Sequence, residues 1–198
     1  VRMERQLGHQ WRENGFKQVL GSQWLIVGFG NIGQTLARQV KGFGAEVTGV
    51  KRDLTRHEYA DQLVSLDEVD QHVPLADVVV LSCPLNDQTN QLVNANFLSR
   101  MKPDAVLANI GRGLLVDEDA LVAALDDGKL DYAIMDVFQK EPLPDDSVFW
   151  GHDRVQMTPH SSHRGSRTGE LFDALFAHNL SQFLSGKRVR NLVVPGSF

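Results

Sequence analysis

The chain has 198 residues, of which 42% are hydrophobic and 23% charged, and its formal net charge is −5. These values are typical of one globular domain, or one domain with part of another, and the acidic balance disfavours a nucleic-acid partner. No apolar run is long enough to suggest a membrane span, and no signal peptide is visible. The single cysteine, Cys83, excludes an internal disulfide and ends an apolar run, which favours a buried, inert thiol in a cytoplasmic protein.

Segments typical of strands alternate with segments typical of helices along the chain. Residues 2–14 carry apolar side chains at four-residue spacing, which predicts a helix with one buried stripe. Further helices are predicted after the glycines at 28–33, at 94–101, at 117–125 and at 166–184, with a short one at 66–69, and strands at 24–28, 46–50, 76–82, 105–110, 132–137 and 155–158. This alternation predicts an α/β fold with a doubly wound, mainly parallel sheet of the Rossmann type.

Two of the predicted helices have a recognisable apolar face. Residues at three- and four-residue spacing define each face. They are Ile32, Leu36, Val40 and Phe43 in the first helix of the sheet region, and Leu171, Leu175, Phe176 and Leu180 in the last helix.

Three glycines lie where the first strand turns into the following helix. The sequence Gly28-Phe29-Gly30-Asn31-Ile32-Gly33 is G-x-G-x-x-G in the strand–turn–helix context that gives this motif its meaning. Gly28 permits the tight turn, Gly30 lets a pyrophosphate approach the backbone, and Gly33 lets the helix pack against the strand. The N–H groups of the helix start, at Asn31 and Ile32, favour phosphate. The motif therefore predicts a dinucleotide site.

The end of the second strand bears on the choice of cofactor. An NAD-preferring domain places Asp or Glu about 20 residues after the glycines, to hold the ribose 2′-hydroxyl. Here that place reads Val50-Lys51-Arg52, and Asp53 follows. Two cations favour a 2′-phosphate, so we predict NADP ahead of NAD. The alternative is a solvated basic pair, with Asp53 serving NAD.

The remaining strand ends carry the motifs of a known family. In order along the chain they are Pro84 and Thr89, Met101-Lys102-Pro103, Asn109-Ile110-Gly111-Arg112-Gly113, Val116-Asp117, Asp136-Val137-Phe138, Glu141-Pro142-Leu143 and Thr158-Pro159-His160. With the glycine motif, this series resembles the D-2-hydroxyacid dehydrogenases, and in particular glyoxylate/hydroxypyruvate reductases, along the whole chain. Ligands of such sheets bind at the carboxyl ends of the strands, where most of these motifs lie.

The resemblance implies three catalytic residues. His160 matches the acid/base histidine, which exchanges a proton with the substrate oxygen. Glu141 matches its carboxylate partner, which favours the protonated ring. Arg112 matches the substrate-binding arginine, whose planar guanidinium can form two hydrogen bonds to a 2-oxoacid. Without the resemblance, each would be interpreted as an ordinary surface or loop residue.

The resemblance also implies further contacts with the cofactor. Asp136 matches a position at the nicotinamide end, although an aspartate that ends a strand can instead cap the next turn. No metal is predicted. Besides the glycine-turn residues, Lys51 and Arg52, the predicted cofactor-binding set comprises Cys83, Pro84, Thr89, Asn109, Ile110, Gly111, Arg112, Asp136, His160 and Ser162.

The domain organisation follows from the same resemblance. Residues 1–20 are predicted to be an interdomain linker helix, residues 21–165 the dinucleotide-binding domain, and residues 166–198 a C-terminal helix and tail that return toward the substrate domain. Most of that domain, about 100 residues, precedes the linker in the family. A fragment, an incomplete chain or a truncated gene product would each have the sequence seen here.

The resemblance implies hydride transfer between NAD(P)H and C2 of a small 2-oxoacid, in a homodimer. The alternative is a non-catalytic dinucleotide-sensing module of the corepressor type. A formate-dehydrogenase-like activity is disfavoured, because that branch has glutamine where Glu141 stands.

Overall fold

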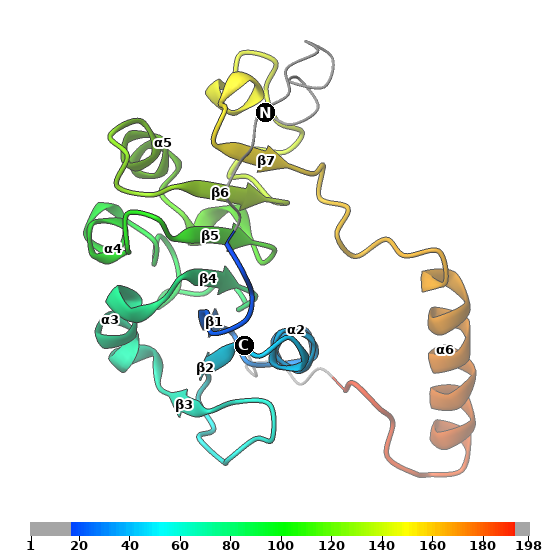
Figure 1. Ribbon diagram of the computed structural model, residues 1–198. Coiled ribbons are helices and arrows are strands. Elements are labelled where there is room, and N and C mark those ends of the chain that lie inside the picture. Colours follow the sequence, from blue (N-terminus) through cyan, green and yellow to red (C-terminus); the bar gives the residue numbers. More distant parts are fainter. Residues whose placement is uncertain (1–16, 193–198) are drawn as a thin grey trace.

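Seven parallel strands form the centre of the computed structural model, which describes residues 17–192 (Figure 1). Their order is β3-β2-β1-β4-β5-β6-β7, and it reverses between β1 and β4. The doubly wound, parallel sheet predicted from the sequence is confirmed. The strands are β1 (Gln23–Val27), β2 (Glu46–Val50), β3 (Gln62–Val64), β4 (Val78–Leu81), β5 (Val106–Asn109), β6 (Tyr132–Met135) and β7 (Val155–Met157).

Helices cover both faces of the sheet (Figure 1). On one face lies α2 (Asn31–Gly42), and on the other lie α3 (Val69–His72), α4 (Ala95–Arg100) and α5 (Glu118–Asp126). Side-chain caps fix where two of them begin: Asn94 accepts hydrogen bonds from two N–H groups of α4, and Asp117 accepts one from α5. Short 3-10 turns occur at Leu66–Glu68, Val73–Leu75, Gly113–Leu115 and Val148–Gly151.

Each face of the sheet has its own hydrophobic cluster, because successive strand residues point in opposite directions. Leu25 and Leu107 pack with α4 and α5, whereas Ile26 and Val47 pack with α2. The strand β4 is buried on both faces, as its all-apolar sequence predicts.

Three details of the prediction need correction or lie outside the described residues. The predicted face of the helix at 31–42 is wrong at its ends, since Ile32 and Phe43 are 59% and 68% exposed. Small residues, Gly33 and Ala37, face the sheet instead and let α2 approach it closely. The strand β3 lies in a stretch that the sequence pattern left without a strand. The helix predicted over residues 2–14 lies outside the described residues.

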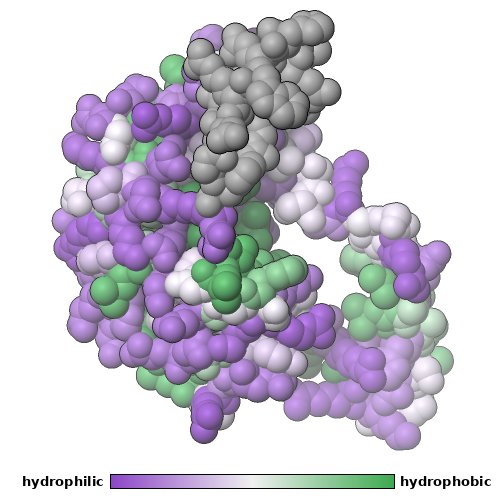
Figure 2. Space-filling model, in the orientation of Figure 1, coloured by the Kyte–Doolittle hydropathy of each residue, from purple (hydrophilic) through white to green (hydrophobic). Residues whose placement is uncertain are grey.

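The last helix, α6 (Thr168–Leu184), stands apart from the sheet (Figure 1). It begins two residues later than predicted, and none of its residues is buried. Hydrophobic side chains gather on it (Figure 2), namely Leu171, Phe172, Phe176, Leu180, Phe183 and Leu184. Within the described residues, no helix combines the length and the hydropathy needed to cross a bilayer.

Candidate active site

The parallel sheet brings the predicted site residues to one edge. Gly28, Lys51 and Cys83 follow the carboxyl ends of β1, β2 and β4, the strands on either side of the point where the strand order reverses. The ends of β5, β6 and β7 lead to Arg112, Asp136 and His160, respectively. This edge is where ligands of doubly wound sheets bind.

The glycine turn has the geometry that a dinucleotide needs. Gly28 has φ +98°, and a Cβ there would lie 2.4 Å from the backbone nitrogen of Cys83, so no other residue fits. A Cβ at Gly33 would lie 2.4 Å from the Gly28 carbonyl oxygen. By contrast, a Cβ at Gly30 would meet nothing within 4 Å, so this backbone faces open space. Gly30 also provides no side-chain cap for α2, whose N-terminal N–H groups favour an anion.

A cleft of about 620 Å³ adjoins this turn, which is within the usual range of cofactor sites. It contains seven of the predicted cofactor residues: Gly28, Gly30, Lys51, Arg52, Cys83, Pro84 and Thr89. Phe29, Gln34, Leu66, Asn86, Asp87 and Gln88 also line it and were not predicted. The other predicted residues do not line this cleft: Asn31, Ile32 and Gly33 belong to α2, and Asn109, Ile110, Gly111, Arg112, Asp136, His160 and Ser162 lie beyond β4 along the same edge.

Two of the cleft residues are held by burial and hydrogen bonds. Thr89 is buried, and its hydroxyl donates to the Pro84 carbonyl at 2.8 Å, which shapes the loop after β4. Cys83 is also buried, as predicted, and this burial raises the pKa of its thiol to about 11. A thiol of this kind stays protonated at neutral pH and is a poor nucleophile.

The residues that bear on the choice between NADP and NAD directly follow β2. Lys51, Arg52 and Asp53 all line the cleft. One carboxylate oxygen of Asp53 accepts hydrogen bonds from the hydroxyl and the backbone N–H of Thr55, at 2.6 and 3.0 Å. These two bonds lower the pKa of Asp53. One oxygen of the carboxylate is therefore engaged within its own turn.

The loop after β5 presents Arg112. Asn109 is fully buried and makes two hydrogen bonds to the loop: its amide nitrogen donates to the Arg112 carbonyl at 3.0 Å, and its oxygen accepts from Gly111 N–H at 3.1 Å. The Arg112 guanidinium donates to the Gly111 carbonyl at 2.7 Å, and the residue is exposed. Asn109 thus acts on the shape of the loop.

His160 and Glu141 meet, although 19 residues separate them in the sequence. His160 Nδ1 lies 2.7 Å from Glu141 Oε2, and the other oxygen of Glu141 accepts Phe138 N–H at 2.9 Å. Desolvation raises the pKa of Glu141, but the Phe138 and His160 hydrogen bonds outweigh it and lower the pKa. Glu141 is thus charged at neutral pH and can hold a protonated imidazole in place.

Asp136 lies at the end of β6 and is buried. Its carboxylate accepts hydrogen bonds from the turn after β7, including the N–H and the hydroxyl of Ser162. The sequence left open a contact with the cofactor and a cap of the next turn; the carboxylate instead binds the turn after β7, and a contact with the cofactor stays a prediction.

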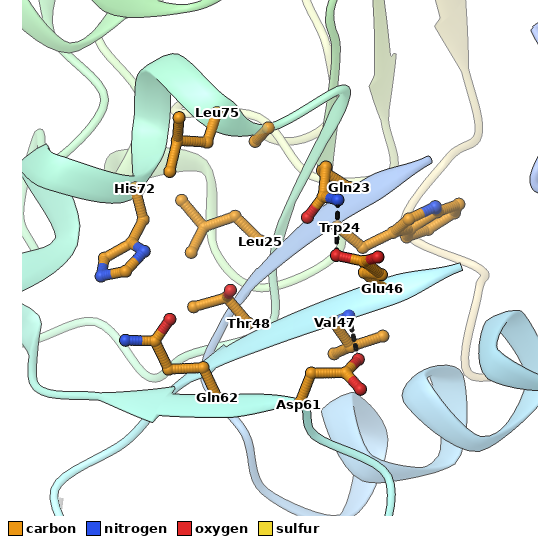
Figure 3. Close-up of a pocket in the computed structure, with 11 residues that line it drawn as sticks. Gln23, Trp24, Leu25, Glu46, Val47, Thr48, Asp61, Gln62, His72 and Leu75 are labelled. Carbon is orange, nitrogen blue, oxygen red and sulfur yellow. Dashed lines mark hydrogen bonds between the residues drawn. The ribbon is translucent and has the colours of Figure 1, made fainter. Parts of the chain in front are cut away.

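A second, smaller hollow of about 210 Å³ lies toward the amino ends of β1, β2 and β3 (Figure 3). In it Gln23 donates to Glu46 at 2.7 Å, and Val47 N–H donates to Asp61 at 2.8 Å. None of the residues predicted for the active site lies there. The hollow is at the edge opposite the candidate active site.

The fold and the site together define a dinucleotide-binding α/β domain with a histidine–carboxylate pair at the carboxyl edge of its sheet. The family model described as the D-isomer specific 2-hydroxyacid dehydrogenase, NAD binding domain, matches residues 2–162. The chain therefore belongs to the D-isomer specific 2-hydroxyacid dehydrogenase family, as the motifs predicted.

Individual relatives agree with this assignment. A glyoxylate reductase of Thermococcus onnurineus is 39% identical over 180 residues, which are 88% of this chain and 52% of that protein. The crystal structure of a D-isomer specific 2-hydroxyacid dehydrogenase family protein from Aeromonas salmonicida has a TM-score of 0.88 and 34% identity, over 98% of this chain and 62% of that one. An NADPH-dependent glyoxylate/hydroxypyruvate reductase from Sinorhizobium meliloti, in complex with NADP and sulfate, has a TM-score of 0.86 and 27% identity, over 97% and 61%. The chain spans about half the length of the curated relatives it matches.

Proposed function

We propose that the protein reduces a small 2-oxoacid, such as glyoxylate or hydroxypyruvate, to the 2-hydroxyacid with a nicotinamide cofactor. The contact between His160 and Glu141 carries this proposal, because it places a charged carboxylate against an imidazole at the ligand-binding edge of the sheet. The relatives named above support it: two are described as glyoxylate or glyoxylate/hydroxypyruvate reductases. None of these is described as a corepressor, so the non-catalytic alternative has no support.

Each of the three residues has a distinct role in this reaction. Arg112 binds the carboxylate and the carbonyl oxygen of the substrate, which orients and polarises the carbonyl carbon. His160 donates its proton to the carbonyl oxygen as that oxygen gains negative charge. Glu141 fixes the orientation of the ring through Nδ1, and its negative charge stabilises the ring when it is protonated. When bound, the reduced nicotinamide supplies the hydride. In the oxidation direction the same residues act in reverse, and neutral His160 accepts the proton.

Two substitutions in the full-length polypeptide test these roles. His160→Ala should abolish reduction of glyoxylate at every pH, and Arg112→Lys should lower kcat/KM by about 100-fold, because a point charge cannot reproduce two oriented hydrogen bonds. Both residues also belong to the predicted cofactor-binding set, so the Kd of NADPH is measured in each variant to separate a loss of cofactor binding from a loss of the chemical step. Arg100→Lys, at an ion pair on α4, is the matched control for the arginine. Wild-type kcat/KM in Arg112→Lys would remove Arg112 from the substrate site.

We also propose that NADP(H) is the preferred cofactor, with Lys51 and Arg52 next to its 2′-phosphate. Both residues line the cleft beside the glycine turn, and Asp53, which would serve NAD, has one carboxylate oxygen engaged by Thr55. A hydrogen bond to a charged group contributes about 1.5–3 kcal/mol. Since tenfold preference needs only about 1.4 kcal/mol, one such contact is sufficient.

Binding titrations with both cofactors test this preference. The double variant Lys51→Ala/Arg52→Ala should lose affinity for NADPH selectively, whereas the matched double variant Lys187→Ala/Arg188→Ala, in the tail after α6, should not. The proposal fails if the wild type binds NADH more tightly, or if the first double variant loses affinity for both cofactors equally.

We further propose that the protein is a cytoplasmic homodimer and that residues 166–198 pack against a substrate domain. The exposed apolar side chains of α6 support a contact of this kind, because large apolar patches usually mark an interface. Light scattering of the purified protein tests the dimer, the mass of the native polypeptide tests whether it includes a substrate domain, and fractionation of the source cells tests the location.

A further inference from the structure

The backbone at His160 adopts an unusual conformation. Its φ is +48°, in the left-handed region that residues other than glycine rarely occupy. Such a conformation persists only where the surrounding structure holds it. The question is which group holds this turn, since the direction of the imidazole depends on it.

A single residue, Asp136, binds to every residue of the turn except Pro159. Its backbone carbonyl accepts His160 N–H at 2.8 Å. Its carboxylate oxygen Oδ1 accepts the Thr158 hydroxyl at 2.5 Å and the N–H groups of Ser161 and Ser162 at 2.9 and 3.1 Å. The other oxygen, Oδ2, accepts the N–H and the hydroxyl of Ser162, at 3.1 and 2.6 Å. The bonds lie on both sides of His160 in the sequence.

The carboxylate makes these contacts from a buried position, although Thr158 and Ser162 are exposed. Asp136 is only 2% exposed. Desolvation raises the pKa of its carboxyl group, but the hydrogen bonds from Ser162, Thr158 and Ser161 outweigh this effect and lower the pKa. Because a buried carboxylate can accept several hydrogen bonds at once and is not displaced by water, it fixes a turn more firmly than an exposed cap.

We propose that Asp136 is a positioning residue for His160: through its bonds to Thr158, Ser161 and Ser162 it holds the left-handed turn that aims the imidazole at Glu141. This proposal rests on the proposed function for its effect on catalysis. It differs from a contact between Asp136 and the cofactor, because here Asp136 acts through the protein and its loss leaves cofactor binding intact.

An amide at position 136 would disturb the turn without emptying the space. The carboxylate has acceptors on both oxygens, whereas asparagine has one acceptor and one NH₂ donor. The Ser162 hydroxyl can rotate and accept from that donor, but an N–H group cannot. Asp136→Asn therefore loses at least one bond from the backbone of the turn and keeps most of the packing.

The test uses the full-length polypeptide with Asp136→Asn, Ser162→Ala and a control, Asp77→Asn. Asp77 is also a hydrogen-bonded aspartate, which accepts from Gln23 N–H and from Lys102, but it lies at the start of β4. Three quantities are measured: kcat and KM for glyoxylate, the Kd of NADPH, and the NMR signal of the His160 Nδ1–H bonded to Glu141, assigned by its loss in Glu141→Gln.

We expect kcat to fall about 100-fold in Asp136→Asn, which is the usual effect of a misplaced catalytic group, while the Kd of NADPH stays within twofold. The His160 signal should shift or broaden in Asp136→Asn, shift less in Ser162→Ala, and stay unchanged in Asp77→Asn. If Asp136→Asn does not fold, Ser162→Ala replaces it, because this variant removes only one hydroxyl from an exposed residue. A shift of the His160 signal in Ser162→Ala then supports the proposal, and an unchanged signal contradicts it.

Two results would overturn the proposal. One is a weaker Kd for NADPH with an unchanged His160 signal, which would make Asp136 a cofactor contact. The other is an unchanged signal with unchanged kinetics. Failure of the proposed function looks different, since wild-type protein would then lack turnover with any 2-oxoacid, and the NMR signal would still report whether Asp136 holds the turn.

Discussion

Replacement of Glu141 by glutamine removes the charge beside His160 and nearly preserves the shape of the side chain. In the structure one oxygen of Glu141 lies 2.7 Å from His160 Nδ1, and the other accepts Phe138 N–H at 2.9 Å. The amide oxygen of a glutamine can keep the bond to Phe138, so the loop should hold its position. What is lost is the negative charge that favours the protonated imidazole.

The exposure of the pair sets the size of the effect. A hydrogen bond to a charged group contributes about 1.5–3 kcal/mol, whereas an exposed ion pair contributes about 0.2–1 kcal/mol. The side chains of His160 and Glu141 are 44% and 35% exposed, so solvent screens the pair and its contribution lies between these limits. Because the negative charge favours the protonated form of a neighbouring imidazole, its removal should move the alkaline limb of the reduction profile to lower pH.

The assay is kcat/KM for the reduction of glyoxylate by NADPH, measured between about pH 5 and pH 10 in wild type and Glu141→Gln. The matched control is Glu118→Gln. Glu118 also accepts a backbone N–H, that of Gln139 at 2.7 Å, in the loop that carries Glu141. If the alkaline limb of Glu141→Gln coincides with that of the wild type, the two groups are not coupled and the reasoning is wrong. An equal shift in Glu118→Gln would assign the effect to the loop.

Three further predictions concern stability and reactivity. Gly28→Ala should destabilise the protein by more than about 1 kcal/mol in urea unfolding, because φ is +98° and the new Cβ would lie 2.4 Å from the Cys83 nitrogen. Gly30→Ala should not destabilise it, because a Cβ there would meet open space. Equal unfolding midpoints for the two variants would contradict this. Cys83 should react slowly with thiol reagents at pH 7 until urea unfolds the protein, because burial raises its pKa to about 11; fast labelling of native protein would contradict it. Desolvation raises the pKa values of Asp61 and Asp77, but hydrogen bonds from lysine and from backbone N–H groups outweigh it and lower both values. The two carboxylates should therefore stabilise the fold above about pH 4, and this stabilisation should be lost as the pH falls through the lowered values. A urea midpoint that is unchanged between pH 6 and pH 3 would refute this.

Most of the strands and their parallel arrangement could be predicted, because buried parallel strands have nearly continuous apolar sequences. The strand β4, at Val78–Leu81, is such a case. The edge strand β3, at Gln62–Val64, has only three residues and begins with an exposed glutamine, so its sequence lacks that signal. The face of α2 was misjudged for a related reason. A periodicity argument gives weight to large residues such as Ile32, whereas close packing of a helix on a sheet selects small ones such as Gly33.

The sequence predicts the residues of the candidate site one by one, and apart from the pairing of His160 with Glu141 it does not indicate how they are connected. His160 and Glu141 were paired through the family resemblance, and nothing in their separation of 19 residues indicates a contact. The hydrogen bonds of Asp136 depend on the left-handed backbone at His160, which a sequence pattern does not reveal. The cleft residues Asn86, Asp87 and Gln88 were missed because polar residues in a loop carry no periodic signal.

The loops that carry Arg112 and Glu141 are joined at Gly113. A Cβ at Gly113 would lie 2.0 Å from the carbonyl carbon and oxygen of Phe138, so the two backbones touch at a point that admits no side chain. Phe138 N–H in turn binds Glu141, and Arg112 directly precedes Gly113. The roles proposed for Arg112, Glu141 and His160 therefore depend on one contact between the loops after β5 and β6. Two motifs that are separate in the sequence are thus packed against each other, and their close approach requires that residue 113 has no side chain.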